Sequence, residues 1–347
     1  MESRVRNLDD ITLEEKVDFL KREESYPHPT GAVESIETHM SWVFLAGQYA
    51  YKLKKPVIYE FIDFSTPEKR LLDCREEVRL NRRLAAEVYL GVVPLTLDPE
   101  GSLSLVGEGK PVDWLVKMKR LPRWEMLDEA IRNRSWHPHD LEAVSELLID
   151  FYAKAIPADV TPIEYENRLE SDLDSTFREL RGPRSRLSRP ALDATEQSLI
   201  NFLTFRSELL AKRVEEARIV EGHGDLRPEH VCLRNPPSII DCLEFNRDLR
   251  LMDSYEELAF LYMECEFLSD PSPAQIILEQ CCRALQDYPP PELFHFYAAR
   301  RAMVRAKLCI RHLEEPEYRE EDKWTRKAIR YLALGQNHAA ACYSPDD

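Results

Sequence analysis

Two aspartates in the second half of the chain constrain its fold more than any other feature. Asp225 lies in the run His223-Gly224-Asp225-Leu226-Arg227-Pro228-Glu229-His230, and Asp241 follows the apolar run Ser238-Ile239-Ile240. The first aspartate therefore belongs to a short loop, and the second ends a β-branched segment about one hairpin later. A carboxylate in such a loop can orient a hydroxyl group, and a carboxylate at such a strand end can hold Mg²⁺ against nucleotide phosphates.

Length and charge limit the class of protein. The chain has 347 residues, of which 44% are apolar, so it is long enough for one enzyme of two lobes or for two modest domains. Its formal net charge of −16 argues against nonspecific binding to nucleic acid or to an anionic membrane, because both need a basic surface. A polyanionic ligand therefore requires a local cationic pocket.

The cysteines and the first residues indicate where such a chain resides. The eight cysteines show neither a Cys-x-x-Cys spacing nor a Cys/His zinc pattern, which favours structural thiols in a reducing compartment. Residues 1–25 are charged rather than apolar, and no run of about 18 apolar residues occurs in the chain. We expect a cytoplasmic protein without a membrane or nucleic-acid partner, and the sequence leaves its oligomeric state open.

Periodicity predicts an α+β protein of two lobes. Residues 1–33 read as a leader helix and turn, residues 34–119 as a small, mainly antiparallel lobe, and residues 120–347 as a helical lobe. In the small lobe we expect a helix over 66–84 and strands at 41–45, 49–56, 92–95, 103–106 and 112–118. In the helical lobe we expect helices over 141–155, 165–180, 191–217, 255–268, 274–285, 291–313 and 322–339, and brief strands at 219–220, 231–233 and 238–240.

The first of these motifs resembles a known family. His223-Gly224-Asp225 is similar to the His-Gly-Asp run of kinase-like phosphotransferases, above all the aminoglycoside phosphotransferase-like branch that acts on small molecules. The following residues, Leu226 to His230, resemble the Leu-Lys-Pro-Glu-Asn run of protein kinases. The resemblance covers residues 34–313 and implies a bilobal protein kinase-like fold, with a β-rich N-lobe and a large helical C-lobe.

The resemblance assigns the two aspartates to catalysis and to metal binding. It implies that Asp225 is the catalytic base and that Arg227 neutralises the transferred phosphate, although Arg227 can equally form a surface salt bridge. It implies that Asp241 binds Mg²⁺. Glu244 adds a second carboxylate that assists the metal or pairs with Arg247 or Arg250.

Nucleotide-binding residues are expected in the first lobe. Ala50-Tyr51-Lys52 resembles the Ala-x-Lys strand of the family, which makes Lys52 the phosphate-binding lysine. Lys54 lies on the same strand face, and lysines on an edge strand are often only solvated. We expect Glu77, rather than Glu76, to be the ion-pair partner of Lys52.

Ser41, Met118 and His230 complete the expected site. No glycine-rich phosphate loop precedes the lysine strand, so the turn at Thr38, His39 and Ser41 is expected to offer hydroxyl and backbone donors. Met118 lines the adenine pocket or belongs to the ordinary core. His230 stands where the family has a metal-binding asparagine, and imidazole suits Mn²⁺ or Zn²⁺ better than Mg²⁺.

These residues together predict a phosphotransferase that uses ATP and Mg²⁺, with Mn²⁺ as a possible substitute, and phosphorylates a hydroxyl of a small polar metabolite. The alternatives are a pseudokinase that binds nucleotide without turnover, and a protein kinase or nucleotidyltransferase on the same fold. A helical scaffold that carries these motifs by chance is a further alternative. The acidic residues Glu264, Glu266 and Asp270 either attract a cationic acceptor or are simply solvated.

Overall fold

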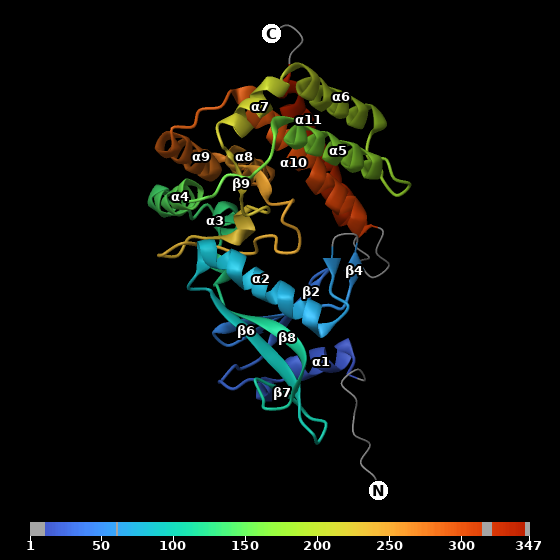
Figure 1. The fold of residues 1–347 in the computed structure, drawn as a ribbon, viewed down its shortest axis with the longest axis vertical. Helices are drawn as coiled ribbons and strands as arrows, with labels where there is room; N and C mark the ends of the chain where they lie inside the picture. Colours follow the sequence, from blue (N-terminus) through green and yellow to red (C-terminus); the bar gives the residue numbers. More distant parts are fainter. Residues whose placement is uncertain (1–10, 60–61, 314–320, 344–347) are drawn as a thin grey trace. The chain divides into compact units, whose positions relative to one another are not determined.

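The computed structural model describes residues 11–59, 62–313 and 321–343, and it divides into two compact units (Figure 1). Unit 1 contains Met1–Glu125 and Ser238–Asp248, and unit 2 contains Met126–Pro237 and Leu249–Asp347. The predicted α+β class is confirmed, because unit 1 is built on a sheet and unit 2 mainly on helices. The chain returns to unit 1 for the segment that carries Asp241, which the sequence did not indicate.

Unit 1 is built on a six-stranded antiparallel sheet in the order β1-β2-β3-β8-β6-β7. Its strands are β1 (Glu34–Glu37), β2 (Ser41–Ala46), β3 (Tyr49–Lys54), β6 (Tyr89–Leu97), β7 (Leu103–Leu105) and β8 (Lys110–Lys119), and a separate hairpin is formed by β4 (Ile58–Tyr59) and β5 (Ile62–Asp63). The strand β1 was not predicted, because its Glu-Ser-Ile-Glu sequence at the sheet edge shows no apolar alternation. In the register of the sheet, Lys52 of β3 lies between Val43 of β2 and Val116 of β8.

The two faces of this sheet bury different side chains of β3. Tyr51 and Leu53 point into a core that also contains Val17 and Leu20 of the leader helix α1 (Leu13–Leu20). Ala50 points to the opposite face, where it packs with residues of β8 and of α2 (Pro67–Ala85). Because strand side chains alternate, Lys52 and Lys54 share this second face with Ala50. The lysines therefore face α2, which lies across β6 and β8 in Figure 1.

The helix α2 has a clear start signal in the sequence. The Thr66 hydroxyl accepts a hydrogen bond from the amide of Lys69, and Pro67 occupies the first turn. The helix spans nearly the residues that we predicted, and it buries Glu77 completely in the face that it turns to the sheet. An uncompensated buried carboxylate is costly, so Glu77 requires cationic partners.

A buried ion triad joins the leader helix to the sheet. Asp113 of β8 accepts two hydrogen bonds from Arg70 of α2, at 2.7 and 2.8 Å, and one from Lys16 of α1 at 2.8 Å. All three residues are buried. The leader segment is thus part of the packed core of unit 1 where it is described, while the predicted leader residues 1–10 lie outside the described chain.

Unit 2 is mainly helical. Its helices are α3 (Leu127–Asn133), α4 (Pro138–Ala153), α5 (Pro162–Leu180), α6 (Arg189–Phe205), α7 (Ser207–Glu215), α8 (Ser254–Phe267), α9 (Ser272–Leu285), α10 (Pro291–His312) and α11 (Glu321–Cys342). Short strands are β9 (Ile219–Glu221), β10 (Val231–Cys232) and β12 (Leu251–Asp253), with β9 and β12 paired antiparallel, while β11 (Ser238–Ile239) belongs to unit 1. The 3-10 turns are η2 (Glu23–Ser25) and η3 (Arg123–Glu125) in unit 1 and η4 (Pro228–His230) in unit 2.

Two differences from the prediction have local causes. The expected single helix over 191–217 is two helices, because the backbone leaves the helical region at Arg206, with φ −135° and ψ 19°. No glycine or proline marks this break, and the apolar periodicity continues through it. The short helix α3 was missed because it has only seven residues and no side-chain cap at its start.

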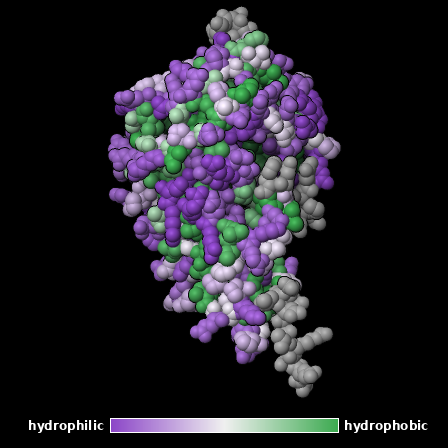
Figure 2. All heavy atoms as spheres, in the orientation of Figure 1, coloured by the Kyte–Doolittle hydropathy of each residue, from purple (hydrophilic) through white to green (hydrophobic). Residues whose placement is uncertain are grey.

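The core of unit 2 forms around α10, which packs against α5, α8 and α11. The Asp253 carboxylate caps α8 by accepting the amide of Tyr255, and it also binds the buried Arg213. All eight cysteines lie in described parts of the chain and are free thiols, and seven of them are buried. On the face drawn in Figure 2, charged and polar side chains dominate, with apolar ones scattered among them. Within the described residues, no helix combines the length and the apolar character that crossing a membrane requires.

Candidate active site

Lys52 of unit 1 lies between two carboxylates. Its Nζ is 2.9 Å from Oε1 of Glu77 and 3.1 Å from Oδ1 of Asp241. The neighbouring Glu76 instead binds Arg79 on the outer face of α2. The contact that we predicted between Lys52 and Glu77 is therefore present, and the chain also brings Asp241 to the same ammonium group.

The backbone around Asp241 is held by two side chains of unit 1. The Tyr89 hydroxyl accepts the amide of Asp241 at 3.2 Å, and Oδ1 of Asn81 accepts the amide of Cys242 at 2.9 Å. Asp241 itself has φ +62°, a left-handed conformation that is unfavourable for a residue with a Cβ. These contacts fix the strained residue, while its side chain remains 48% exposed and accessible to a ligand.

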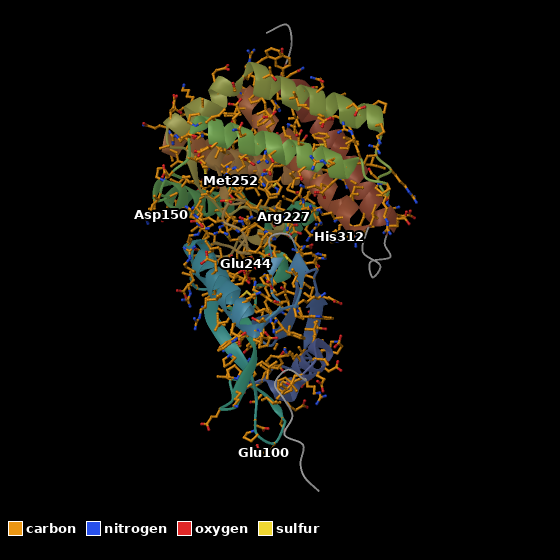
Figure 3. The ribbon with its side chains drawn as sticks, turned by 45° about the vertical axis from the view of Figure 1, so that its right-hand side comes forward. Glu100, Asp150, Arg227, Glu244, Met252 and His312 are labelled. Atoms are coloured by element: carbon orange, nitrogen blue, oxygen red, sulfur yellow. The ribbon has the colours of Figure 1, made fainter. Side chains whose placement is uncertain are left out.

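Lys54 contacts three carboxylates. Its Nζ lies 2.6 Å from Asp73, 2.7 Å from Glu77 and 2.5 Å from Glu244. The Lys54 side chain is only 1% exposed, and Figure 3 labels Glu244 beside α2. The sequence predicts a metal or an arginine as the partner of Glu244, and in the structure Glu244 contacts Lys54.

The charges around Lys52 and Glu77 keep both side chains ionised. Burial disfavours the ammonium form of Lys52, but the carboxylates of Asp241 and Glu77 outweigh burial and raise the pKa of Lys52 well above its ordinary value. Burial likewise opposes the charge of Glu77, and the two lysines lower its pKa below the ordinary value. Four carboxylates (Asp73, Glu77, Asp241 and Glu244) thus lie around two ammonium groups.

The carboxylate oxygens of this group are suitable ligands for Mg²⁺. Mg²⁺ prefers hard oxygen ligands, usually one or two carboxylates together with substrate phosphates and water. Asp241 supplies an accessible carboxylate of this kind, and Lys52 beside it supplies a positive charge for phosphate oxygens.

In unit 2, Asp225 lies in the loop between β9 and η4, and Arg227 binds it directly. Oδ2 of Asp225 accepts a hydrogen bond from Nε of Arg227 at 2.9 Å, and Arg227 also forms an ion pair with Glu229. Figure 3 labels Arg227 in this unit. Burial opposes the charge of Arg227, but the carboxylates of Asp225, Glu229 and Glu264 together outweigh burial and raise the pKa of the guanidinium. Arg227 is thus paired with the residue expected to act as the base. This ion pair does not lie on the surface, because the Arg227 side chain is only 15% exposed.

The metal-binding role expected for His230 is not supported by the geometry of its ring. Nδ1 lies 2.8 Å from the carbonyl oxygen of Asp225, and Nε2 lies 3.1 Å from Nη2 of Arg227. A guanidinium only donates, so Nε2 accepts and Nδ1 carries the proton that it donates to the carbonyl. Both ring nitrogens are used inside the loop, where His230 holds the backbone of Asp225, and metal binding by His230 stays a prediction.

Glu257 of α8 supports this loop and was missed as a site residue. Its Oε1 accepts the amide of Gly224 at 2.5 Å, and its Oε2 accepts the Tyr152 hydroxyl of α4 at 3.0 Å. Glu257 approaches so closely that a Cβ on Gly222 would lie 2.5 Å from its carboxylate. The sequence signals were the glycines at 222 and 224, the latter with φ +87°.

Two expected nucleotide-binding residues lie in packed surroundings. The amide of Ser41 donates to Oγ1 of Thr38, and the carbonyl of Ser41 accepts the Thr38 amide, so the backbone groups of Ser41 are used within the turn. Met118 is buried in the core between the sheet and α2, where Ala50 and the partly buried Ile240 also pack. A phosphate contact by Ser41 and an adenine contact by Met118 both stay predictions.

The acidic residues considered for attracting a cationic acceptor have partners within unit 2. Glu264 is buried and binds Arg305 and Tyr331. Glu266 binds His338, and Asp270 accepts the indole N–H of Trp136. These carboxylates stabilise the helical unit, and they do not form a solvated acidic surface.

Solved structures of kinases share this fold. A choline/ethanolamine kinase family protein from Mesorhizobium loti has a TM-score of 0.52 with 13% identity and covers 93% of this chain and 99% of its own. The GDP complex of aminoglycoside 2'-phosphotransferase-IIIa has a TM-score of 0.52 with 13% identity, covering 94% and 99%. Choline kinase from Cryptosporidium parvum Iowa II has a TM-score of 0.53 with 8% identity, covering 93% and 94%. The protein kinase-like fold expected from the motifs is confirmed.

Sequence comparison assigns the family. The uncharacterized proteins Rv2004c of Mycobacterium tuberculosis and Mb2027c of Mycobacterium bovis are each 34% identical over 307 residues, which is 87% of this chain. The chain spans 59% of the length of these relatives. The model of the phosphotransferase enzyme family matches residues 60–294, which include both aspartates and Glu77. The chain belongs to the phosphotransferase enzyme family.

Proposed function

We propose that this protein is an ATP- and Mg²⁺-dependent kinase that transfers the γ-phosphate of the nucleotide to a hydroxyl group of a small polar metabolite. The observation that carries the proposal is the position of Lys52, whose ammonium group contacts Glu77 and Asp241 together. A lysine held by a buried glutamate and placed beside a half-exposed aspartate combines a phosphate-binding cation with a metal-binding carboxylate.

The roles in unit 1 follow from these contacts. Glu77 is buried and fixes the Lys52 side chain, so that its ammonium group is oriented before a nucleotide binds. Asp241 would hold Mg²⁺, which balances the charge of the nucleotide phosphates and of the transition state. Lys52 would then exchange its contact with Asp241 for one with a phosphate oxygen.

The roles in unit 2 follow from the loop at Asp225. Asp225 orients the acceptor hydroxyl so that its oxygen attacks the γ-phosphorus in line with the bond to ADP. As the new P–O bond forms, the bond from the γ-phosphorus to the bridging oxygen breaks, ADP leaves, and Asp225 receives the hydroxyl proton. Arg227 holds Asp225 and lies next to the position where phosphate charge develops.

Family membership supports the assignment of both aspartates to phosphotransfer, and the similar aminoglycoside phosphotransferase and choline kinase structures support a small-molecule acceptor. A cytoplasmic location fits a kinase that uses ATP, and the free, buried cysteines agree with the reducing compartment expected there.

The test is phosphate transfer by the purified protein. ATP and GTP are each supplied with Mg²⁺ or Mn²⁺ against a panel of amino sugars, amino alcohols, sugars and aminoglycosides, and the release of ADP or GDP is measured. We expect acceptor-dependent turnover that Asp225→Asn abolishes while nucleotide affinity is kept. Equal rates for the wild type and Asp225→Asn on every acceptor would refute catalysis by this loop.

A second candidate is a pseudokinase, and the geometry of His230 favours it. The family's metal-binding asparagine is replaced by a histidine whose two ring nitrogens are used within the loop. Nucleotide binding without turnover under all of these conditions would select this candidate. We expect His230→Asn to raise metal-dependent turnover in a working kinase and to leave a pseudokinase inactive.

A further inference from the structure

The contacts of Lys54 differ from those of Lys52 although both lysines face α2. Lys52 is partly exposed, with 15% of its side chain accessible, and it reaches the accessible Asp241. Lys54 is fully buried, and the oxygens that surround it belong to Asp73, Glu77 and Glu244. Its ammonium group is therefore placed to hold protein carboxylates together, away from a ligand.

Glu77 links the two lysines into one network. Its Oε1 binds Lys52 and its Oε2 binds Lys54, so each oxygen of one carboxylate is held by a different strand residue. The same two lysines contact both ends of the Asp241–Glu244 segment, Lys52 at Asp241 and Lys54 at Glu244. Moving Lys54 would thus disturb the carboxylate that orients Lys52 and the segment that carries Asp241.

The carboxylates around Lys54 are close enough to bind an ion without it. One oxygen from each of Asp73, Glu77 and Glu244 can be chosen so that all three lie within 4.8 Å of one another. Lys54 fills this space with a cation that is covalently part of the chain. Burial opposes its charge, but Glu244 and Glu77 outweigh burial and raise the pKa of Lys54 well above its ordinary value.

We propose that Lys54 is a built-in cation that occupies a three-carboxylate cage in place of a metal ion, and that it is a positioning residue for Lys52 and for the Asp241–Glu244 segment. The positioning role rests on the proposed kinase function, whereas the cage itself does not. Because Lys54 holds Glu244, the inference assigns metal binding in unit 1 to Asp241 and excludes Glu244 as a ligand while Lys54 is present.

The first experiment needs neither nucleotide nor acceptor. Lys54→Met removes the ammonium group and keeps an unbranched apolar side chain. We expect the melting temperature to fall by about 5–10 °C, since the buried Glu77 and the partly buried Asp73 and Glu244 lose their common partner. Millimolar Mn²⁺ or Ca²⁺ should recover much of this loss, because the emptied cage becomes a cation site, and cation titration should show one site more than the wild type has.

Lys55→Met is the matched control. Lys55 is the next residue and also forms an ion pair, but its partner Glu37 is 41% exposed and no carboxylate cage surrounds the pair among the described residues. We expect this variant to respond to Mn²⁺ as the wild type does. An equal cation response in the wild type, Lys54→Met and Lys55→Met would overturn the proposal, as would an unchanged melting temperature in Lys54→Met.

A double variant covers the case in which Lys54→Met does not fold. Lys54→Met/Glu244→Gln removes one carboxylate charge together with the lysine, so charge compensation predicts that the double variant is more stable than the single one. A soluble double variant beside an insoluble single variant supports the cage. If both variants are insoluble, Lys54 is needed for its packing and the proposal fails.

Nucleotide measurements then separate the cage from the proposed function. In a working kinase we expect Lys54→Met to weaken ATP binding at least tenfold, and added Mn²⁺ to restore it more fully in this variant than in Lys52→Met. If the wild type binds no nucleotide, the proposed function fails, and the cation response of Lys54→Met still decides the cage. If the wild type binds ATP and Lys54→Met binds it equally well, the positioning role is refuted.

Discussion

The carboxylate of Glu257 accepts the backbone amide of Gly224 at 2.5 Å, so a buried side chain of α8 fixes the loop that carries Asp225. The second oxygen of Glu257 accepts the Tyr152 hydroxyl, and the loop is thereby tied to α4 as well. Neither of these two hydrogen bonds involves Asp225 itself. Its position nevertheless depends on Glu257, because the amide that is held belongs to the residue before it.

Glu257→Gln tests this dependence. The substitution replaces one acceptor oxygen by an NH₂ group. This group faces either the Gly224 amide or the Tyr152 hydroxyl and cannot accept its hydrogen bond. We expect a loss of about 1–3 kcal/mol in the free energy of unfolding and a fall in kcat, measured by urea titration and by the phosphotransfer assay. Tyr152→Phe removes only one donor and should cost less. A Gln variant with unchanged stability and kcat would show that the loop is held by other contacts.

Lys52→Met should weaken nucleotide binding. In the proposed function the ammonium group that contacts Asp241 also binds a phosphate oxygen. A hydrogen bond to a charged group contributes about 1.5–3 kcal/mol, so the Kd for ATP should rise by about 10- to 100-fold. Fluorescence titration with a labelled ADP measures this. Lys55→Met is the control and should bind as the wild type does. Unchanged affinity in Lys52→Met would remove Lys52 from the proposed site.

Arg227→Met should separate catalysis from binding. Loss of the guanidinium removes one hydrogen-bond partner of the Asp225 carboxylate and a positive charge beside it. We therefore expect kcat to fall by about 10²- to 10³-fold. The KM for ATP should change little, because the described contacts of Arg227 all lie in unit 2. Steady-state kinetics measure both constants. Arg227→Lys keeps the charge but not the planar contact and should be intermediate. A raised KM with unchanged kcat would contradict this role.

Asp113→Asn should destabilise unit 1. The substitution leaves the buried Arg70 and Lys16 without their shared carboxylate, and breaking a buried pair in this way costs about 3–5 kcal/mol. Urea titration measures the change. The control is Asp63→Asn, whose ion pair with Lys69 is nearly half exposed, so its unfolding curve should match that of the wild type. Equal curves for the two variants would mean that the triad does not hold the leader helix.

Alkaline pH should destabilise the protein. Burial raises the pKa of Cys74 and Cys281 from 9.0 to about 12 and that of Cys309 to about 11. Above about pH 9 the unfolded chain loses these thiol protons while the folded chain keeps them, so the free energy of unfolding falls as pH rises. Each thiol contributes about 1.4 kcal/mol per pH unit between the two values. Urea titrations at successive pH values, with Cys281→Ala as comparison, should show a steep decline that is shallower in the variant. Equal slopes in the wild type and Cys281→Ala would show that this thiol does not contribute to the decline.

The amino-acid sequence alone was enough to predict the family and the fold class, and to name the residues of the candidate site. The reason is that local rules fix these features: alternation puts Lys52 and Lys54 on one strand face, the Thr66 cap starts α2, and the motifs at Asp225 and Asp241 occupy short segments. It could not separate the helices at Arg206, because the break there has no glycine or proline.

The pairing of charged side chains depends on the folded arrangement and does not follow from local sequence rules. Neighbouring positions along a helix do not separate Glu77 from Glu76, and the burial of Glu77 against β3 is what distinguishes them. The Lys54 cage joins β3, α2 and the Asp241–Glu244 segment, and the Glu257 contact joins α8 to the loop after β9. Such partners are far apart in the chain, and burial makes their pairing obligatory because an unpaired charge away from water is too costly to keep.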